Sequence, residues 1–460
     1  MGLQDKIAHY KEFKQGVSHC TFNPEGPGVV RIHLIPPKFR LFGNSAYIVI
    51  LNGYYLLPIG RSWALLLSFF MKEVNRYDGK PIGEAEEAQI LKNTVGRMHA
   101  AYPFVTRDAL REDLYEMLDV LFAVAHGEGG ELDLEKLSIR GYAKHMTAPH
   151  RVDLMVSAMT DEAGGWKCNQ KCTFCYAAGQ ARSGARELDT GEWKAVIDKL
   201  IASNVPMLTF TGGEPTLRED IDLLIAHAKA CVTRLNTNGI LLTKELVAKL
   251  KAAGLDSVQI TLYSHDATVH NALVGAARFE DTVQGIRNAV EGGLDVSVNT
   301  PLCKKNADYE RTLAFIRSLG VRFVTASGLI CTGMASAAHK AYDLTQEELI
   351  DIITAAKHTC DDADIEIDFT SPGLLPRKVL EDLGMNVPMC GAALSNMAIA
   401  PDGTVVPCQS WLGGDANLGN ILTDSFKRIW KHPMCKTLRA MSEDQALSCP
   451  FRARKGGDRV

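Results

Sequence analysis

Trp166–Tyr176 reads W-K-C-N-Q-K-C-T-F-C-Y, and this stretch decides how the rest of the chain is interpreted. The three thiols of Cys168, Cys172 and Cys175 lie within eight residues. This spacing leaves too little chain between them for a disulfide framework. Three thiolates so closely spaced can hold three irons of a four-iron cluster and leave the fourth iron without a protein ligand. The stretch therefore predicts an iron site with an open coordination position, where chemistry can take place.

A zinc site is the alternative for these thiols, because cysteine thiolates also bind zinc in tetrahedral sites. A zinc site needs a fourth ligand close by, and no histidine occurs between His150 and His227. The absence of a nearby histidine in the sequence weakens the zinc interpretation.

The composition is that of an ordinary globular protein. The chain has 460 residues, 46% hydrophobic and 23% charged, which allows two or three domains. Its net charge of -4 gives no reason to expect nucleic acid or an anionic membrane as the main partner. Residues 46–71 are the most apolar stretch, but polar residues, glycine and proline interrupt them, so a hairpin and a helix are expected there and no membrane span.

The start of the chain and its cysteines favour a cytoplasmic location. Met1–Lys14 carries scattered charges and no apolar core of a secretory signal. Twelve cysteines in such a chain indicate metal binding or catalysis more than disulfides.

Residues 1–145 are predicted to form a small N-terminal domain. Residues 1–40 are rich in proline and glycine and are predicted to be loop. Tyr47–Leu57 contains two apolar runs around Asn52-Gly53, a strong hairpin signal. Apolar periodicity then predicts three helices, Arg61–Val74, Glu84–His99 and Arg107–Ala125. A hairpin followed by helices is typical of a winged-helix-like binding domain, and residues 127–150 are predicted to be its connector.

Residues 146–360 alternate between predicted strands and helices. The strands are Val152–Ser157, Met207–Thr211, Val232–Leu235, Ser257–Tyr263, Asp295–Thr300 and Arg322–Ala326. The helices are Thr190–Ser203, Arg218–Lys229, Thr243–Ala253, Phe279–Glu291, Tyr309–Leu319 and Thr345–Thr359. Six βα units predict a parallel sheet with right-handed crossovers, and they are too few to close an eight-stranded barrel. The predicted fold class is α/β, a partial (β/α)6 barrel whose site lies at the carboxyl ends of its strands.

A second motif, Thr211-Gly212-Gly213-Glu214-Pro215, follows the second predicted strand. Two glycines at a strand end let a ligand approach the backbone, and the carboxylate can accept hydrogen bonds from an ammonium group. Alone, this motif is an ordinary βα turn.

Together the two motifs resemble those of the radical S-adenosylmethionine (SAM) enzymes over about residues 150–340. That family carries C-x-x-x-C-x-aromatic-C, here with Phe174 at the aromatic place, and G-G-E-P one βα unit later. The resemblance implies a [4Fe-4S] cluster held by the three cysteines, with SAM on the open iron. It implies an electron donor such as flavodoxin or ferredoxin, and reductive cleavage of SAM to a 5′-deoxyadenosyl radical.

The same resemblance implies which residues contact SAM. Gly212, Gly213 and Glu214 would meet the methionine ammonium, and Tyr176 would lie near the adenine. Further candidates for the ribose end, which are equally explained as ordinary polar residues at strand ends, are Thr261, Ser264 and Asn299.

Residues 361–460 are predicted to form a cysteine-rich auxiliary cluster domain. Their Cys390…Cys408 spacing and the segment N-L-G-N-I resemble the SPASM or twitch extensions of radical SAM enzymes. The resemblance implies one auxiliary iron–sulfur cluster on Cys390, Cys408, Cys449 and Cys435, of which Cys435 stands where the family often has an apolar residue. Arg452 occupies the place of a further cysteine, so a second auxiliary cluster is not expected. A zinc knuckle is the alternative.

The N-terminal hairpin and helices resemble, in order and pattern, the PqqD-like recognition element that binds leader peptides by strand addition; a structural cap is the alternative. The predicted function is therefore a radical SAM enzyme that modifies a ribosomally synthesised precursor peptide, by crosslink, thioether or epimerisation. The alternative enzyme is a radical SAM dehydrogenase of a sugar or cyclitol alcohol. A non-enzymatic iron–sulfur scaffold is disfavoured by the turn at Gly212–Glu214.

Overall fold

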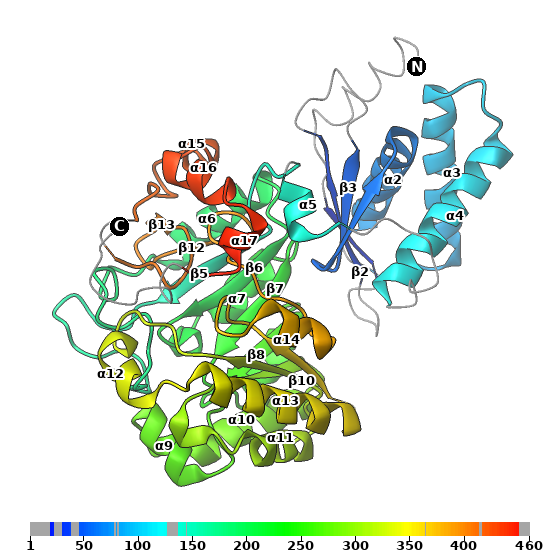
Figure 1. Cartoon of the computed structure of the whole chain (residues 1–460). Helices are drawn as coiled ribbons and strands as arrows, with labels where there is room; N and C mark the ends of the chain where they lie inside the picture. The colour runs from blue at the N-terminus through cyan, green and yellow to red at the C-terminus, as the bar shows by residue number, and fades with distance from the viewer. Residues whose placement is uncertain are drawn as a thin grey trace. The chain divides into compact units, whose positions relative to one another are not determined.

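The computed structural model describes residues 19–22, 30–37, 46–77, 80, 82–126, 137–143, 145–363, 365–413 and 416–449. The chain divides into two compact units, the first made of residues 1–150 with 200–206 and 230–232, and the second made of the remaining residues (Figure 1). The dipeptide Asp78-Gly79, which predicts a turn, and much of the predicted connector lie outside the described residues. In the part of the chain that is described, no helix is long and apolar enough to span a membrane.

The first unit contains a four-stranded antiparallel sheet in the order β1-β2-β3-β4. Its strands are β1 (His19–Phe22), β2 (Val30–Ile35), β3 (Tyr47–Leu51) and β4 (Tyr55–Ile59). The predicted hairpin is confirmed, because Asn52 and Gly53 adopt the positive φ values of 51° and 69° that its turn requires. The prediction of loop throughout residues 1–40 is wrong for β1 and β2. The run V-R-I-H-L-I of β2 is buried at every position, and its proline- and glycine-rich surroundings had obscured it.

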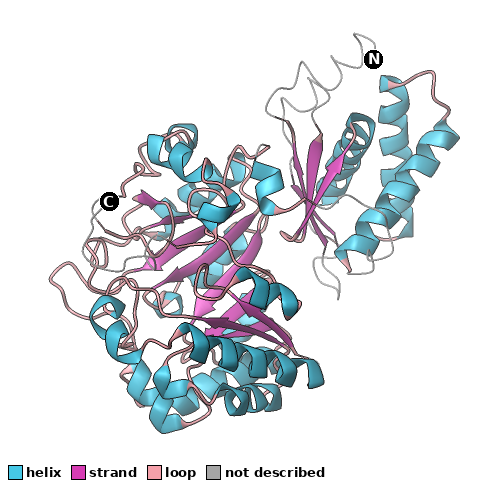
Figure 2. Cartoon of the chain, viewed as in Figure 1, coloured by secondary structure: helices cyan, strands magenta, loops and turns pink. Residues whose placement is uncertain are grey.

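Three helices pack on this sheet, as predicted (Figure 2). They are α2 (Arg61–Val74), α3 (Glu84–Ala101) and α4 (Arg107–Ala125). Their apolar faces share one core with β1–β4, to which α4 contributes Leu114 and Leu118. The Thr106 side chain accepts a hydrogen bond from Ala109 N at 3.3 Å and caps α4. A short helix, α5 (Ile139–Ala143), follows.

The second unit is built on a nine-stranded sheet in the order β11-β10-β9-β8-β7-β6-β5-β12-β13. Its strands are β5 (Arg151–Ser157), β6 (Met207–Gly212), β7 (Val232–Thr237), β8 (Ser257–Thr261), β9 (Asp295–Pro301), β10 (Phe323–Ser327), β11 (Glu366–Phe369), β12 (Asn396–Ile399) and β13 (Val405–Val406). All six predicted barrel strands are confirmed. The strand pairs β12–β5, β5–β6, β7–β8, β8–β9, β9–β10 and β10–β11 are parallel, whereas β13 is antiparallel to β12.

The helices of this unit connect or follow the strands of the sheet, and α10, α11 and α13 lie together beside it (Figure 1). They are α6 (Thr190–Ala202), α7 (Ile221–His227), α8 (Lys244–Ala252), α9 (Ala267–Val274), α10 (Phe279–Glu291), α11 (Tyr309–Ser318), α12 (Ala335–Tyr342), α13 (Gln346–Asp362) and α14 (Arg377–Asp382), followed near the carboxyl terminus by α15 (Phe426–Trp430), α16 (Pro433–Arg439) and α17 (Glu443–Ala446). At the start of α6, Asp189 and Glu192 exchange hydrogen bonds, and the Thr243 side chain caps α8. The helices that were not predicted are α9, α12, α14, α16 and α17.

The strands of the parallel sheet have one apolar and one polar face. In β8 and β9 the buried residues Val258, Ile260, Val296 and Val298 alternate with half-buried polar ones. The apolar set forms the core beneath the helices, so the polar set lines the concave side of the sheet. This alternation made the strands recognisable in the sequence.

Candidate functional site

Three chemically notable segments are carried by neighbouring strands. The loop with Cys168, Cys172 and Cys175 follows β5, and the Gly212–Glu214 turn follows β6, which pairs with β5. On the other side of β5 lies β12, whose hairpin partner β13 leads into Cys408. The sheet therefore brings together segments that are far apart in the sequence.

The loop that carries the three cysteines is held by two helices. The backbone N–H groups of Lys171 and Thr173 donate to Val274 O and Leu273 O at the end of α9, each at 2.9 Å. The Phe174 ring is buried, with its centre 5.2 Å from that of Tyr342 in α12. The aromatic residue of the motif thus anchors the loop, and the helices α9 and α12, which were not predicted, support it.

The three thiols are half-buried and close enough to influence one another's ionisation. Burial, with smaller contributions from the nearby Glu214 and Cys175, raises the pKa of Cys168 to about 12. Burial also raises the pKa of Cys172 and Cys175. Three neighbouring thiols with raised pKa values need a metal cation to become thiolates at neutral pH.

The donor set fits an iron–sulfur cluster better than a single metal ion. Among the described residues, no group of three or more His, Cys, Asp or Glu side chains is arranged to hold one metal ion. A [4Fe-4S] cluster takes one thiolate on each of three separate irons, so its ligands do not converge on a point. Cys168, Cys172 and Cys175 would hold such a cluster.

The glycines of the second motif let the turn pack closely against the end of β5. Gly212 has a φ of 136°, and a Cβ added there would lie 2.3 Å from Ser157 O. A Cβ on Gly213 would lie 2.5 Å from Ala158 O. Larger residues are therefore excluded by the neighbouring strand. The Gly213 carbonyl also accepts a weak hydrogen bond from Cys168 Sγ at 3.5 Å, so the turn contacts the cysteine loop.

Glu214 is a buried carboxylate whose described partners are all hydrogen-bond donors. Its Oε1 accepts from Thr216 N, Thr216 Oγ1 and Thr237 Oγ1 at 2.6–3.0 Å, and its Oε2 accepts from Asn238 N at 2.8 Å. Burial raises its pKa, while these hydrogen bonds act to lower it. No described Lys or Arg side chain forms an ion pair with it, and Oε2 retains a free acceptor site. This carboxylate fits a ligand ammonium group.

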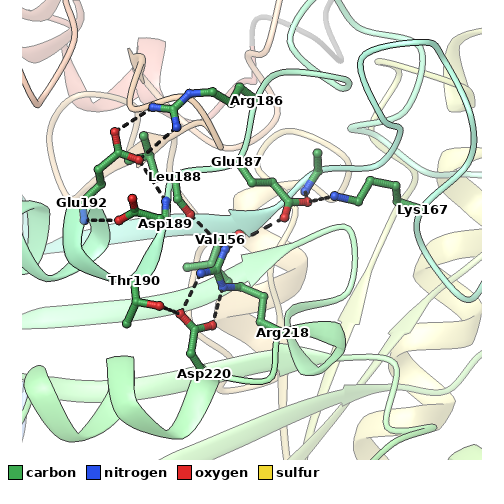
Figure 3. Close-up of polar contacts among 11 residues, drawn as sticks. Val156, Lys167, Arg186, Glu187, Leu188, Asp189, Thr190, Glu192, Arg218 and Asp220 are labelled. Atoms are coloured by element: carbon green, nitrogen blue, oxygen red, sulfur yellow. Dashed lines mark hydrogen bonds and ion pairs between the residues drawn. The ribbon is translucent and has the colours of Figure 1, made fainter.

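A network around Arg218 ties the turn to the cysteine loop (Figure 3). The guanidinium donates to both carboxylate oxygens of Asp220, at 2.9 and 2.8 Å, and to Val156 O and Leu188 O, each at 3.1 Å. The Glu187 carboxylate lies 4.0 Å from Arg218 Nη1 and accepts from Lys167 Nζ at 2.5 Å. Because Lys167 precedes Cys168, the network fixes one motif relative to the other (Figure 3).

The remaining predicted SAM-binding residues lie in different settings. Ser264 is buried and accepts a hydrogen bond from Asp266 N at 3.0 Å, which forms the turn into α9. Thr261 and Asn299 are neighbours at the ends of β8 and β9, and both are half-buried on the polar face. Asn299 Oδ1 accepts from Thr325 Oγ1 at 2.9 Å. Their assignment to the ribose stays a prediction.

Tyr176 reaches away from the cysteine loop toward β13. Its hydroxyl donates to Gln409 Oε1 at 3.0 Å. Its carbonyl accepts from Gln180 Nε2 at 2.6 Å and from Thr332 Oγ1 at 3.2 Å. With hydroxyl and carbonyl engaged, the ring face is the part of Tyr176 that fits the predicted contact with adenine.

Three of the four predicted auxiliary ligands come together. Burial raises the pKa of Cys408 to about 12, with smaller contributions from Cys390 and Cys449, which lie near it. Cys435 lies elsewhere: it is fully buried in α16, and its thiol donates to Ile429 O at 3.6 Å. Burial raises the pKa of the Cys435 thiol to about 11, although the charge of the nearby Arg439 side chain and a hydrogen bond with it act to lower that pKa. We therefore leave Cys435 out of the proposed ligand set.

Sequence reasoning missed several residues of the site. Thr237 and Asn238 donate hydrogen bonds to the Glu214 carboxylate. Gln409 accepts a hydrogen bond from Tyr176, and Arg218 donates one to Val156 O in β5. For Thr237 and Asn238 a signal existed, since the polar run N-T-N-G ends β7 at the same edge of the sheet. For Arg218 and Gln409 only the folded structure reveals the partners.

The cysteine loop and the tail match two family models. Residues 167–319 match the radical SAM superfamily, and residues 390–450 match SPASM, described as an iron–sulfur cluster-binding domain. The chain is 35% identical over 142 residues to Fe-coproporphyrin III synthase of Methanosarcina barkeri, covering 30% of this chain and 36% of that protein. It is 28% identical to mycofactocin maturase MftC of Mycolicibacterium smegmatis, covering 64% of this chain and 75% of that protein.

Two further proteins extend the comparison. The sporulation killing factor maturation protein SkfB of Bacillus subtilis is 30% identical, with 57% of this chain and 62% of that protein covered. Among solved structures, SuiB of Streptococcus suis bound to the precursor peptide SuiA superposes with a TM-score of 0.58 at 15% identity. It covers 86% of this chain and 88% of that one, which shows a shared fold. The chain spans about a third of the first curated relative and between three fifths and three quarters of the other two.

These matches confirm the predicted cofactor classes, namely a [4Fe-4S] cluster with SAM and auxiliary iron–sulfur binding. Together with the paired cysteine loop and Gly212–Glu214 turn, they show that residues 167–319 are similar to the radical SAM superfamily and that residues 390–450 are similar to the SPASM iron–sulfur cluster-binding domain.

Proposed function

We propose that this protein is a radical SAM enzyme that modifies a ribosomally synthesised precursor peptide. The observation that carries the proposal is the contact between the cysteine loop and the turn holding the buried carboxylate of Glu214. The bound cluster and SAM supply a 5′-deoxyadenosyl radical, which abstracts a hydrogen atom from the substrate. The electron comes from a donor such as reduced flavodoxin or ferredoxin.

The residues of this chain then have distinct tasks. Cys168, Cys172 and Cys175 hold the cluster, and Gly212 and Gly213 give the turn its close approach to β5. Glu214 pairs with the methionine ammonium of SAM, which compensates for the burial of its charge. Cys390, Cys408 and Cys449 hold an auxiliary cluster, and a fourth ligand from substrate or solvent completes it.

The peptide class is supported by the printed names of similar proteins. MftC and SkfB are named as maturation proteins, and the SuiB structure contains a precursor peptide. The N-terminal sheet and helices precede the barrel domain in the order of a PqqD-like recognition element. In that element a leader peptide adds to a sheet edge. At the β4 edge, Leu56 O accepts a hydrogen bond from Leu137 N at 2.9 Å, so this edge can pair with a backbone outside the sheet.

A second candidate function follows from the polar face of the barrel sheet. Gln259 Nε2 donates to Thr325 Oγ1 at 3.0 Å, and Thr325 Oγ1 donates to Asn299 Oδ1 at 2.9 Å. These half-buried amides and hydroxyls suit peptide amides and also the hydroxyls of a sugar or cyclitol. Dehydrogenation of such an alcohol is therefore the alternative.

Two assays test the proposal with the anaerobically reconstituted full chain. The first measures 5′-deoxyadenosine after addition of SAM and dithionite, and Cys172→Ala should abolish its formation. The second incubates the enzyme with short peptides encoded beside its gene and records their masses. A peptide altered only when SAM is present supports the proposal. Formation of 5′-deoxyadenosine that is stimulated by polyols and by no peptide would favour the alternative.

A further inference from the structure

The loop that follows Cys175 and the loop that follows Cys408 are locked together by side chains. We call residues 175–183 the SAM-cluster loop and residues 408–413 the auxiliary loop. The amide of Gln180 spans both: its Nε2 donates to Tyr176 O and to Ser410 O, at 2.6 and 3.1 Å, and its Oε1 accepts from Leu412 N at 3.1 Å. Arg182 N also donates to Leu412 O at 3.2 Å. All polar groups of the Gln180 amide side chain thus hold one loop against the other.

Within this lock, one hydrogen bond joins residues that directly follow a proposed ligand of each cluster. Tyr176 follows Cys175, and Gln409 follows Cys408. The bond from Tyr176 Oη to Gln409 Oε1 is 3.0 Å long. The two proposed clusters are therefore joined by a path that is covalent except for a single hydrogen bond.

The cysteine loop that leads into Tyr176 also contacts the SAM turn, since Gly213 O accepts a weak hydrogen bond from Cys168 Sγ at 3.5 Å. Tyr176 is itself the residue predicted to lie near the adenine of SAM. A displacement of Tyr176 when SAM binds would therefore reach Gln409 through one hydrogen bond.

The surroundings make this arrangement stiff. An apolar core packs around both loops and includes Ala177, Ala178 and Leu412, with Tyr176 and Cys175 packed against it. From the other side, Gly333 leaves no room for a side chain, since an added Cβ would lie 2.4 Å from Tyr176 O. Close-packed interiors transmit small displacements instead of absorbing them.

We propose that Gln409 is a positioning residue that couples the two clusters: through Tyr176, occupation of the SAM site changes the environment of the auxiliary cluster. This inference rests on the proposed function, because it requires both clusters. It adds that the auxiliary cluster responds to SAM before any substrate chemistry occurs. A purely structural lock would hold the loops equally well and would transmit nothing.

The test uses the reconstituted full chain and electron paramagnetic resonance of the dithionite-reduced clusters, with and without SAM. Gln409→Met removes the acceptor while keeping the side-chain length, and Tyr176→Phe removes the donor. Gln346→Met is the matched control, because Gln346 donates a single hydrogen bond, to Leu374 O, at an exposed position. A variant with alanine at Cys168, Cys172 and Cys175 identifies the auxiliary signal.

In the unaltered protein and in the Gln346→Met control, SAM should change both the SAM-cluster signal and the auxiliary signal. In Gln409→Met the SAM-cluster signal should still change, and the SAM-dependent change of the auxiliary signal should be lost, because the hydrogen bond that transmits it is gone. Combining Gln409→Met with Tyr176→Phe should reduce the auxiliary response no further than the larger single effect, because both substitutions remove one bond.

Two results would overturn the coupling and leave the proposed function intact. One is an auxiliary signal that ignores SAM in the unaltered protein although the SAM-cluster signal responds. The other is a full auxiliary response in Gln409→Met. Failure of the proposed function looks different, since neither signal would respond to SAM and no 5′-deoxyadenosine would form.

Discussion

Replacement of Arg218 by methionine tests how the two cofactor-binding segments are held together. The Arg218 side chain is only 12% exposed, and its bidentate partner Asp220 is 17% exposed. Methionine keeps the apolar stem, but it leaves the Asp220 carboxylate and the carbonyls of Val156 and Leu188 without their cation (Figure 3). Removing one partner of a buried ion pair costs about 3–5 kcal/mol. Because both partners keep some exposure, we expect a loss of about 3 kcal/mol.

Urea unfolding of the cluster-free protein, followed by circular dichroism, measures this loss. With a urea dependence of about 3 kcal/mol per M for a large unit, the midpoint should fall by about 1 M. Arg377→Met is the matched control, because Arg377 pairs with Glu381 at 2.7 Å while 52% of its side chain is exposed. Such surface pairs contribute under about 1 kcal/mol. Equal midpoints for the two variants would refute the structural role given to Arg218.

Three further predictions concern the site. Glu214→Gln should weaken SAM binding about 10- to 150-fold, the equivalent of about 1.5–3 kcal/mol for a charge-assisted hydrogen bond, and equilibrium dialysis showing a change under about threefold would contradict this. Iron analysis should find Cys435→Ala at the unaltered iron content and Cys408→Ala depleted; equal losses would return Cys435 to the ligand set. Burial raises the pKa of Asp220, but hydrogen bonds led by that from Arg218 outweigh it and hold the pKa below its ordinary value. The stabilisation is therefore present above pH 4 and lost as pH falls through the lowered pKa, so Asp220→Asn should make unfolding midpoints less sensitive to acid between about pH 5 and pH 3.

Local patterns explain what could be predicted from the sequence. Tyr47–Leu57 was recognisable because Asn52-Gly53 suits only a tight turn, and the barrel strands were recognisable by their alternation. The strand β2 was not predicted because the proline- and glycine-rich sequence around its six buried residues indicated a loop. The helix α9 escaped because its eight residues are too few to show a clear period.

The candidate site was predictable only where a motif is contiguous. The close spacing of Cys168, Cys172 and Cys175 identifies them in the sequence as a set of ligands. By contrast, Cys390, Cys408 and Cys449 are separated by many residues, and Cys435 lies between two of them. Spacing alone could not exclude Cys435. The burial of Cys435 in α16 and its hydrogen bond to Ile429 O are visible only in the folded structure. The role of Gln409 is likewise visible only in the folded structure, where the chain after β13 brings its side chain into hydrogen-bonding distance of Tyr176.

The pairing of β5 with β12 makes part of the auxiliary region a strand of the barrel sheet. The prediction separated residues 361–460 from the barrel as a cysteine-rich auxiliary cluster domain. In the structure β11 extends one end of the sheet, and β12 pairs with β5 in parallel register, with Ile399 opposite Leu154. A chain without β12 would expose the edge of β5, the strand that leads into the cysteine loop. Loss of this region would therefore disturb the SAM cluster as well as the auxiliary one, because both are positioned by the same strand.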